Sequence, residues 1–377
     1  MLRDRRKVYI VTASINPLDN LDTLLRVENR RPEKIIVVDE GDESIRKYNR
    51  EILSRYDVEL EFYGPREREN WFRERFGSSY ERFLSVIPEK SHAETSFGFL
   101  VSYEENSDYI IEIDDDVFQF ENYKIIKDHV ENLEMSRGIL ISSSSKWVNT
   151  IDFLEVRGGN GRIFPRGHPY DSSVRIYNYS SRDAEDECIL NMGLWTGIPD
   201  LDAVTILMFG GLDGRPSIYS EKILHEKIIV DKGSYYAVCS MNTSFRRDLV
   251  PAFYQLYMRY MNIDRFDDIW SGIFAKKISD VVGGRFCIGK PALKHEKRPR
   301  SVWKDLRAEL EGMIINEILW RIVDEAPISS RNYHDAYRDL AEHLEKNLNR
   351  FNEEIHFKFM KTQVDKMHLW IEIIDRI

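Results

Sequence analysis

Residues 109–118, Tyr-Ile-Ile-Glu-Ile-Asp-Asp-Asp-Val-Phe, pass from mostly apolar, β-favouring residues directly into three carboxylates. A buried strand does not tolerate consecutive aspartates, so these three are predicted to lie where a strand leaves the core. Alternation along a strand puts Asp114 and Asp116 on one side and Asp115 on the other. Two carboxylates on one side repel each other unless a cation lies between them, and Mg²⁺ and Mn²⁺ prefer oxygen ligands. The stretch alone is equally compatible with a solvated acidic turn that ends the strand.

Strands of similar composition precede this stretch, and helical patterns separate them. The predicted elements are strands at residues 8–13, 34–38 and 58–63, a helix at 21–30 and a helical region at 66–105. Alternating strands and helices indicate a parallel α/β sheet, in which ligands bind beyond the carboxyl ends of the strands. We expect Thr12 and Asp39 to lie at this edge with the three aspartates. Neither GxGxxG nor GxxxxGK[ST] occurs, so neither a dinucleotide fold nor a P-loop is indicated.

The composition limits the classes of protein to consider. With 377 residues, of which 42% are hydrophobic, the chain can bury one large core or two moderate ones. A net charge of -10 argues against nucleic-acid binding, which needs a basic surface. The three cysteines are far apart and form no CxxC pair, so we expect no disulfide framework, no zinc site and a reducing, cytoplasmic location. Residues 1–7 are charged, so we expect no signal peptide there, and no apolar stretch reaches transmembrane length.

The middle of the chain, residues 157–232, is rich in Gly, Pro, Asp and Ser and has little regular periodicity. We interpret residues 158–162 and 166–170 within it as loops over the edge of the sheet, because loops on a rigid scaffold often carry binding groups. An insertion without any role in binding is the alternative.

Asp267 and Asp268 open a predicted helix whose apolar face ends before Gly283. Acidic residues in a first turn cap a helix and interact favourably with its dipole, which requires no further function. Alternatively, one of the two accepts a proton from an acceptor hydroxyl, as a general base does. Both interpretations hold together if Asp267 caps the helix and Asp268 projects from it.

The pattern changes to long helices after residue 302. Apolar residues at helical spacing form one stripe over 337–351 and a second stripe with four-three spacing, Met360, Val364, Met367, Ile371 and Ile374. Such stripes either cover the core of the main domain or pair subunits. The sequence leaves both readings open, and we expect a homo-oligomer.

Seven blocks, taken in order, resemble the reversibly glycosylated polypeptide family, whose plant members act as UDP-arabinopyranose mutases. The first is the strand with the aspartate triplet, residues 111–116. The others are similar to RGxPF at 166–170, GLWxxIPDxDAxT at 193–205, CGMNxAF at 239–245, RYDDMW at 265–270, WHxK at 294–297 and WIEAWDEL at 370–376. No single block is specific, but seven in register over almost the whole chain are.

The resemblance implies a GT-A-like glycosyltransferase fold, a mostly parallel sheet flanked by helices. The nucleotide-sugar-binding domain would span residues 1–300, and a helical extension residues 301–377. Mn²⁺ or Mg²⁺ would lie between Asp114 and Asp116, with His295 as a third ligand. Asp39 would meet the uridine, and Thr12, Asp114 and Asp115 would lie beside the bound UDP-sugar.

The chain departs from the family pattern after residue 166, where the loop up to Gly193 is longer, and at Lys294, where the family has Trp. Plant relatives carry a sugar reversibly on an arginine of the RGxPF block, which corresponds to Arg166. Guanidinium stays protonated and is a poor nucleophile. We therefore expect Arg166, or Arg175 nearby, to bind the pyrophosphate through paired hydrogen bonds.

Together these observations predict a metal-dependent enzyme that acts on a UDP-sugar. The metal and Arg166 would stabilise the departing diphosphate, and Asp268, beside Asp267, would serve as the base. Attack by a sugar or protein acceptor would give a glycoside, whereas return of the diphosphate after a change of ring form would make the protein a mutase. The alternative is a non-catalytic, self-glycosylating scaffold that only binds the UDP-sugar.

Overall fold

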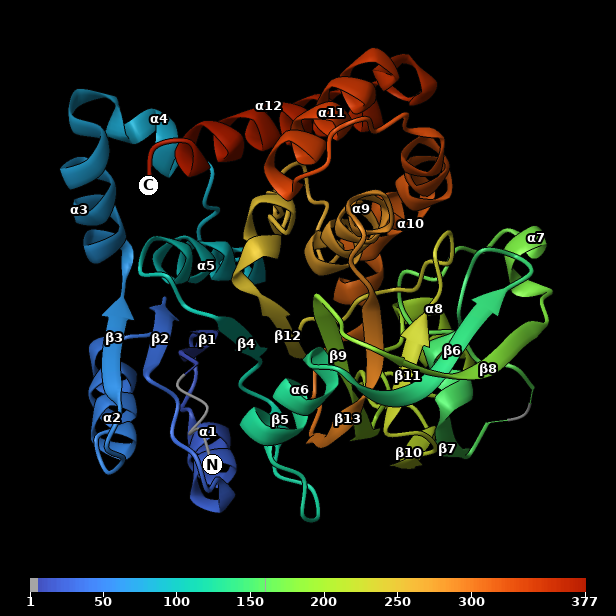
Figure 1. The fold of residues 1–377 in the computed structure, drawn as a ribbon, viewed down its shortest axis with the longest axis horizontal. Helices are drawn as coiled ribbons and strands as arrows, with labels where there is room; N and C mark the ends of the chain where they lie inside the picture. The colour runs from blue at the N-terminus through green and yellow to red at the C-terminus, as the bar shows by residue number, and fades with distance from the viewer. Residues whose placement is uncertain (1–5, 160) are drawn as a thin grey trace.

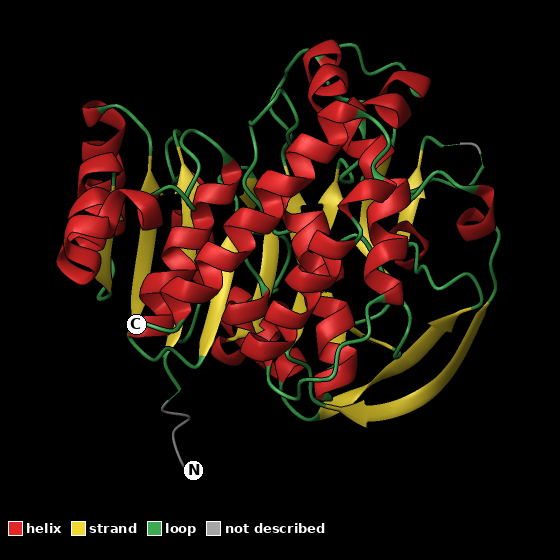
Figure 2. Cartoon of the chain, turned by 90° about the horizontal axis from the view of Figure 1, so that it is seen from above, coloured by secondary structure: helices red, strands yellow, loops and turns green. Residues whose placement is uncertain are grey.

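The computed structural model describes residues 6–159 and 161–377. A 13-stranded sheet crosses the molecule between two layers of helices (Figure 1). Helices α1 (Asp19–Val27), α2 (Glu43–Leu53) and α6 (Ile125–Leu133) cover one face. The other face lies under α5 (Thr95–Glu104), α9 (Asp267–Val282) and the C-terminal helices, which Figure 2 shows in front of the strands. The expected α/β sheet flanked by helices is confirmed.

The N-terminal half of the sheet is parallel. Its strands are β1 (Val8–Ser14), β2 (Lys34–Asp39), β3 (Glu59–Tyr63) and β4 (Tyr109–Ile113), in the order β3-β2-β1-β4. Ile10 lies between Ile35 and Ile111 in the register, and all three are buried. Val- and Ile-rich runs form such strands because both faces of a parallel sheet are covered. These four strands confirm the sequence prediction.

The remaining strands form a mixed sheet in which antiparallel pairs outnumber parallel ones. They are β5 (Val117–Phe118), β6 (Ser136–Ser143), β7 (Leu154–Arg157), β8 (Tyr179–Asp186), β9 (Leu190–Gly197), β10 (Tyr219–Ile223), β11 (Lys227–Val230), β12 (Asn242–Arg246) and β13 (Phe286–His295). Four of them, β8 to β11, fall in residues 157–232, where the sequence shows little periodicity. The two segments predicted as loops, 158–162 (of which residue 160 lies outside the described residues) and 166–170, contain no helix or strand, as expected. The central strand β9 is buried throughout but contains Asn191, which bonds to His129 and to the Lys290 carbonyl, and such internally satisfied polar residues hide the strand pattern.

The helical region expected at 66–105 is broken into shorter pieces. They are α3 (Pro65–Phe76), a 3₁₀ turn (Gly77–Ser79), α4 (Tyr80–Leu84), a second 3₁₀ turn (His92–Glu94) and α5. Pro88 lies between α4, which ends at Leu84, and the second turn, and its missing N–H disfavours helix across this segment. Helix α5 then packs closely on β1, because a Cβ at Gly98 would lie 2.3 Å from a methyl group of Val11.

The C-terminal helices α10 (Val302–Glu325), α11 (Tyr333–Lys346) and α12 (Glu354–Ile374) pack on the rest of the chain, mainly on α9 and the 3₁₀ segment Arg247–Ala252. All five residues of the predicted four-three stripe are buried. Trp370 of α12 stacks on Tyr254 with ring centroids 4.9 Å apart. The sequence left open whether these stripes cover the core or pair subunits. In the structure they are buried in the core of this chain. The shorter helices α7 (Ser172–Arg175) and α8 (Ala203–Met208) lie near the other end of the sheet (Figure 1).

Cys188 and Cys287 form a disulfide with Cα atoms 6.0 Å apart, so the expectation of unpaired cysteines was wrong. They are 99 residues apart in sequence, but β9 and β13 are neighbours, with Leu190 opposite Phe286. Sequence spacing does not reveal such neighbours in a sheet. Cys239 is free and buried.

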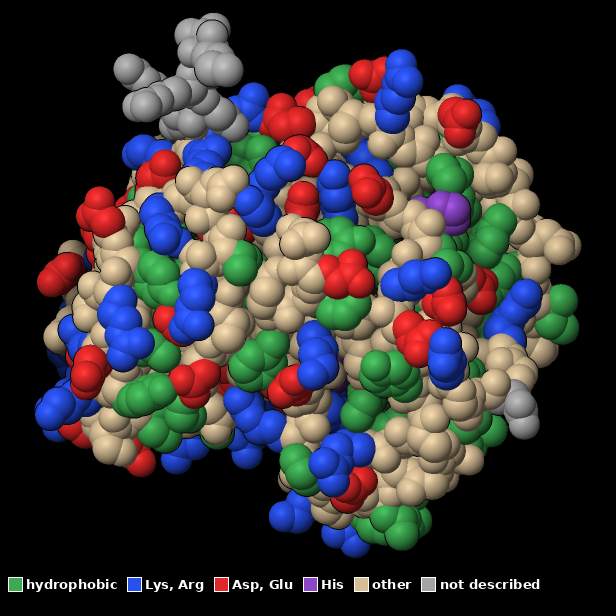
Figure 3. All heavy atoms as spheres, turned by 90° about the horizontal axis from the view of Figure 1, so that it is seen from below, with side chains coloured by type: hydrophobic (Ala, Val, Ile, Leu, Met, Phe, Trp, Pro, Cys, Tyr) green, Lys and Arg blue, Asp and Glu red, His purple; other side chains and the backbone are tan. Residues whose placement is uncertain are grey.

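The surface carries charges of both signs. On the side of α1, α2 and α6, acidic and basic side chains are interspersed (Figure 3). In the described part of the chain, no helix combines the length and apolar character that crossing a membrane requires.

Candidate active site

The aspartate triplet leaves the core as predicted, immediately after β4 ends at Ile113. Because the strand has ended, the three side chains lie in a turn and diverge. The carboxylate of Asp114 lies 2.9 Å from His92 Nε2. Asp115 accepts hydrogen bonds from Ser14 and Asn16 and pairs with Arg298 at 2.5 Å. Asp116 instead faces His295, with 3.6 Å between Oδ2 and Nε2.

One edge of the sheet brings distant segments together. Strand β12 is antiparallel to both β4 and β9, and β13 is parallel to β9. The carboxyl ends of β4, β9 and β13 therefore meet at the edge where β12 begins. A cavity of about 270 Å³ opens at this edge, and its lining includes His92, Asp114, Arg166, Cys239, Ser240, Asp267 and Asp268.

Asp268 lies deep in this cavity with its carboxylate held by backbone and hydroxyl donors. One oxygen accepts hydrogen bonds from the Ser240 N–H at 3.0 Å and the Ser240 hydroxyl at 3.2 Å, and the other accepts from the Ile269 N–H. Burial raises the pKa of Asp268 to about 6; Arg166 opposes this rise and Asp267 adds to it. A carboxylate with such a pKa is ionised at neutral pH and basic enough to accept a proton.

Asp267 points in another direction, toward His92. His92 lies between two carboxylates, with Nδ1 2.8 Å from Asp267 and Nε2 2.9 Å from Asp114. Burial lowers the pKa of His92, but Asp114 and Asp267 outweigh it and raise that pKa well above its usual value. The N-cap position of α9 is Phe266, which makes no side-chain cap hydrogen bond, so neither aspartate is the N-cap residue. Both lie in the first turn of α9, where carboxylates interact favourably with the helix dipole as expected, and Asp268 accepts a hydrogen bond from the Ile269 N–H of that turn. The Asp267 carboxylate instead pairs with the imidazole ring of His92.

Sequence reasoning missed His92. It lies within the stretch that was expected to be continuous helix, and its role depends on two carboxylates from distant segments. Pro88 and the polar residues after it were the available signal, because they interrupt the helical pattern just before His92.

Arg166 is buried and bound on all sides. Its Nε and Nη2 donate to Asp200 at 3.1 and 2.9 Å, and Nη1 donates to the Arg265 carbonyl. Nη2 also lies 3.9 Å from Asp268. Burial lowers the pKa of Arg166, but Asp200 and Asp268 outweigh this and raise it well above its usual value. Conversely, Arg166 outweighs burial at Asp200 and lowers that pKa to about 2. Arg166 is a permanent cation, which fits the expectation that it is no nucleophile.

Gly167 allows Arg166 to reach this position. Its φ of +84° lies in the left-handed region, and a Cβ there would come within 2.5 Å of the Ile269 side chain. The loop at 166–170 thus packs directly on the first turn of α9, which carries Asp268.

The other expected site residues lie outside the cavity lining. Thr12 is buried in β1 with an unpartnered hydroxyl, and Asp39 ends β2, where it pairs with Arg46 at 2.8 Å. Both lie near the carboxyl ends of their strands, as predicted. Arg175 lies elsewhere: its guanidinium covers the rings of Phe164 and Tyr170 and donates to the Pro169 carbonyl.

The model of the reversibly glycosylated polypeptide family matches residues 8–377. The chain belongs to this family. Probable UDP-arabinopyranose mutase 1 of Solanum tuberosum and UDP-arabinopyranose mutase 2 of Arabidopsis thaliana are each 27% identical to it over 395 residues. These alignments cover 100% of this chain and 92% and 93% of the relatives. A solved structure of glucosyl-3-phosphoglycerate synthase from Mycobacterium tuberculosis is 14% identical, with a TM-score of 0.39, and the match covers 84% of this chain and 80% of that one.

Blocks typical of the family meet at the cavity. Ser240 and Met241 come from the block at 239–245, and the Met241 carbonyl accepts a hydrogen bond from the Asp114 N–H. Asp200, to which the sequence assigned no role, comes from the block at 193–205 and fixes Arg166. The blocks at 166–170 and 265–270 supply Arg166, Asp267 and Asp268.

The block at 294–297 lies against the aspartate turn. His295 Nδ1 donates to the Ile198 carbonyl at 2.6 Å, and Nε2, on the opposite side of the ring, lies 3.6 Å from Asp116 Oδ2. Ligating histidines in proteins are oriented by this kind of hydrogen bond at the other ring nitrogen. Two residues on, burial lowers the pKa of Lys297 to about 8. Asp116 and His295 therefore fit a divalent cation at the outer side of the aspartate turn.

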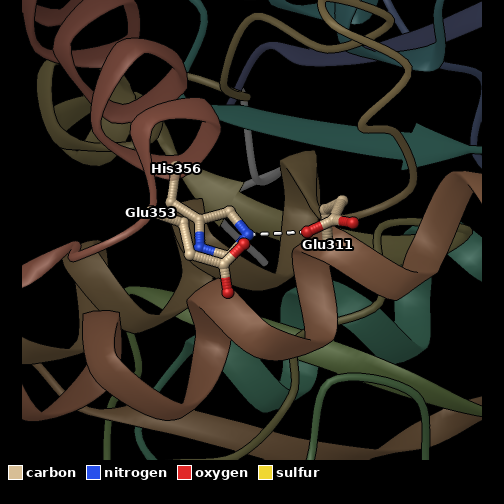
Figure 4. A group of neighbouring side chains, drawn as sticks. All are labelled: Glu311, Glu353 and His356. Carbon is tan, nitrogen blue, oxygen red and sulfur yellow. Dashed lines mark hydrogen bonds and ion pairs between the residues drawn. The ribbon is translucent and has the colours of Figure 1, made fainter.

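A second group of ligand-type side chains lies away from this site. Among the described residues, Glu311 of α10 and Glu353 and His356 at the start of α12 have ligand atoms that all lie within 4.8 Å of one another (Figure 4). His356 is already paired with Glu311 at 2.7 Å. None of the three lines the cavity, and the pair ties α12 to α10.

Proposed function

We propose that this protein is an enzyme that breaks the bond between the sugar and the diphosphate of a UDP-sugar. The observation that carries the proposal is the meeting of Asp114, Arg166 and Asp268, from three separate blocks, in one cavity beyond the carboxyl end of β4. The names of the plant relatives, UDP-arabinopyranose mutases, support the choice of a UDP-sugar as substrate.

Asp116 and His295, with Asp114 at the other end of the turn, are the residues that would hold Mn²⁺ or Mg²⁺. When bound, such an ion neutralises the diphosphate as it leaves the sugar. Asp115 keeps the turn in place through Ser14, Asn16 and Arg298. Thr12 and Asp39, at the ends of β1 and β2, would receive the nucleoside.

Arg166 and Asp268 act on the sugar side of the site. If an acceptor hydroxyl attacks the anomeric carbon, the carbon–oxygen bond to the diphosphate breaks and its electron pair leaves with UDP. The hydroxyl proton passes to Asp268. Arg166, 3.9 Å away, stabilises the ionised form of this base and adds positive charge near the leaving group.

The same residues serve either of two outcomes. Attack by an acceptor gives a glycoside, whereas return of the diphosphate after a change of ring size gives the furanose isomer. The deciding assay incubates the protein with UDP-arabinopyranose and Mn²⁺, with and without acceptors, and separates the products. The furanose isomer identifies a mutase, and UDP with a glycosylated acceptor identifies a transferase. Neither product, over several UDP-sugars, would refute the proposal.

The alternative is a scaffold that carries a sugar on Arg166 without turnover. All three guanidinium nitrogens of Arg166 are already bound by Asp200 and the Arg265 carbonyl, which disfavours attack by this side chain. Intact-mass measurement after incubation with UDP-sugar distinguishes the two: we expect no added sugar on Arg166, and a stable pentose or hexose increment there would favour the scaffold.

A further inference from the structure

The mouth of the cavity is more basic than the rest of the molecule. The chain has a net charge of -10 with histidine counted as neutral, yet five Lys and Arg side chains and His92 line the cavity against four aspartates. Lys90 and Arg259 are exposed on this lining, while Asp267 and Asp268 are buried. Two of the four acids therefore lie at the bottom, Asp114 and Asp264 are half-buried, and exposed basic side chains lie at the opening.

These basic residues are also held in an unusual backbone conformation. Lys90, Arg259 and Arg265 have φ values of 53°, 58° and 70°, in the left-handed region that side-chain-bearing residues rarely adopt. Such conformations persist only where the surrounding structure fixes them, and they are common where a loop grips a ligand. The Arg259 guanidinium donates to the Lys90 carbonyl, so the two loops that carry these residues are joined at the mouth.

Two of these cations, Lys90 and Arg259, form no ion pair among the described residues, although Asp264 on the same lining interacts electrostatically with Arg259. Within the described residues, no carboxylate lies within ion-pair distance of the Lys90 or Arg259 side chain, whereas Arg166 and Arg265 pair with Asp200 and Glu309. The lining excludes Asp116, His295 and Arg298, which lie on the other side of the aspartate turn, where the diphosphate is proposed to bind. Lys90 and Arg259 therefore lie on the cavity side of the turn, away from Asp116 and His295, and are available to a second anion.

We propose that Lys90 and Arg259 bind the anionic group, a phosphate or a carboxylate, of an acceptor whose hydroxyl reaches Asp268. The role of that hydroxyl rests on the proposed function. The anion site adds the class of acceptor, so the reaction would be glycosyl transfer to an anionic acceptor. In this reaction the acceptor oxygen bonds to the anomeric carbon, the bond to the diphosphate breaks, UDP leaves with the electron pair, and the hydroxyl proton moves to Asp268.

The test is a calorimetric titration of the full-length protein, with and without saturating UDP and Mg²⁺. The three probes are glycerol 3-phosphate, glycerate and uncharged glycerol, which distinguish a phosphate site from a carboxylate site. We expect one of the anions to bind the UDP-loaded protein and glycerol not to bind. Lys90→Gln and Arg259→Gln should each weaken anion binding about tenfold, as expected for loss of one charged hydrogen bond.

Lys146→Gln is the matched control, because Lys146 has a φ of 65° but pairs with Asp324 outside the cavity. It should leave anion binding unchanged, and none of the three variants should change the affinity for UDP. The proposal is overturned if neither anion binds, if the mouth variants bind it like wild type, or if they lose UDP affinity, since the cations would then serve the diphosphate. Absence of UDP binding in wild type would refute the proposed function. The titration of the anion without UDP would then still test whether Lys90 and Arg259 bind it.

Discussion

Asp267 and Asp268 are adjacent in sequence, yet their pKa values are shifted in opposite directions. Burial raises both, but the hydrogen bond to His92 outweighs it at Asp267 and lowers that pKa. Pairs of carboxylates with diverging pKa values mark the acid and base assignments of many enzymes. Here the pair singles out Asp268 as the group that can exchange a proton near neutral pH.

Asp268→Asn should lower kcat by about 10²- to 10⁴-fold, the usual contribution of a general base. In wild type, kcat/KM should fall as the pH drops below about 6, because the base becomes protonated there. A pH–rate profile of both proteins measures this. A flat profile between pH 5 and 8, or a variant with wild-type kcat, would show that Asp268 is not the base.

His92 should make stability depend on pH. Its pKa is raised in the folded protein, so the folded state holds more protons than the unfolded one above pH 6.5, and this contribution is lost as the pH rises through the folded pKa. Below pH 6.5 it is fully present. We expect the Tm of wild type to fall relative to that of His92→Gln as the pH is raised from 6.5 to 9, and a constant difference would contradict the ion pairs.

Gly167→Ala should displace Arg166 from Asp268. The new Cβ would strain a φ of +84° and strike Ile269, at a cost of about 1–3 kcal/mol, and a misplaced cation should lower kcat/KM roughly 10²-fold. Gly210→Ala is the control, because Gly210 has a φ of +79° and, among the described residues other than its chain neighbours, no atom lies within 4 Å of a Cβ placed there. Equal losses of kcat/KM in the two variants would show that the position of Arg166 does not matter for the reaction.

At the level of elements, the hydropathy pattern predicted those strands and helices whose burial follows from their own local sequence. The apolar runs that form β1, β2 and β4 were found because they are buried on both faces, and α9 was found with its end at Gly283, where φ is +113°. Strand β9 was missed because Asn191, Gly193 and Thr196 hide its buried character. Their hydrogen bonds come from elements distant in sequence, which no local pattern contains.

Helix α12 should contribute to stability and not to the reaction. Trp370 is fully buried against Tyr254, so Trp370→Ala should cost about 3–5 kcal/mol of unfolding free energy with kcat retained. Trp303→Ala on α10, where the ring is 52% exposed, should cost less than about 0.5 kcal/mol. Denaturant unfolding measures both, and equal losses would mean that α12 is not part of the core.

At the level of the whole molecule, the site exists because the sheet changes direction. Antiparallel β12 between β4 and β9 brings its own start to the edge where those strands end, and this gathers the family blocks. From the sequence we predicted Asp114, Arg166 and Asp268 as site residues, and we predicted that the site lies at the carboxyl edge of the parallel strands. The sequence did not predict His92 or Asp200, because both act through partners that only the folded chain brings near.

The central claim is that the aspartate turn and His295 hold a divalent cation against a nucleotide diphosphate. The direct measurement is the thermal shift of the apoprotein with UDP and Mn²⁺ added separately and together. A ligand at 100 times its Kd stabilises the folded state by about 2.7 kcal/mol, so wild type and Asp183→Ala, altered at an exposed residue of β8, should show a joint shift. Asp116→Ala should lose that shift while keeping its unliganded Tm. No joint shift in wild type, or an undiminished shift in Asp116→Ala, would contradict the claim.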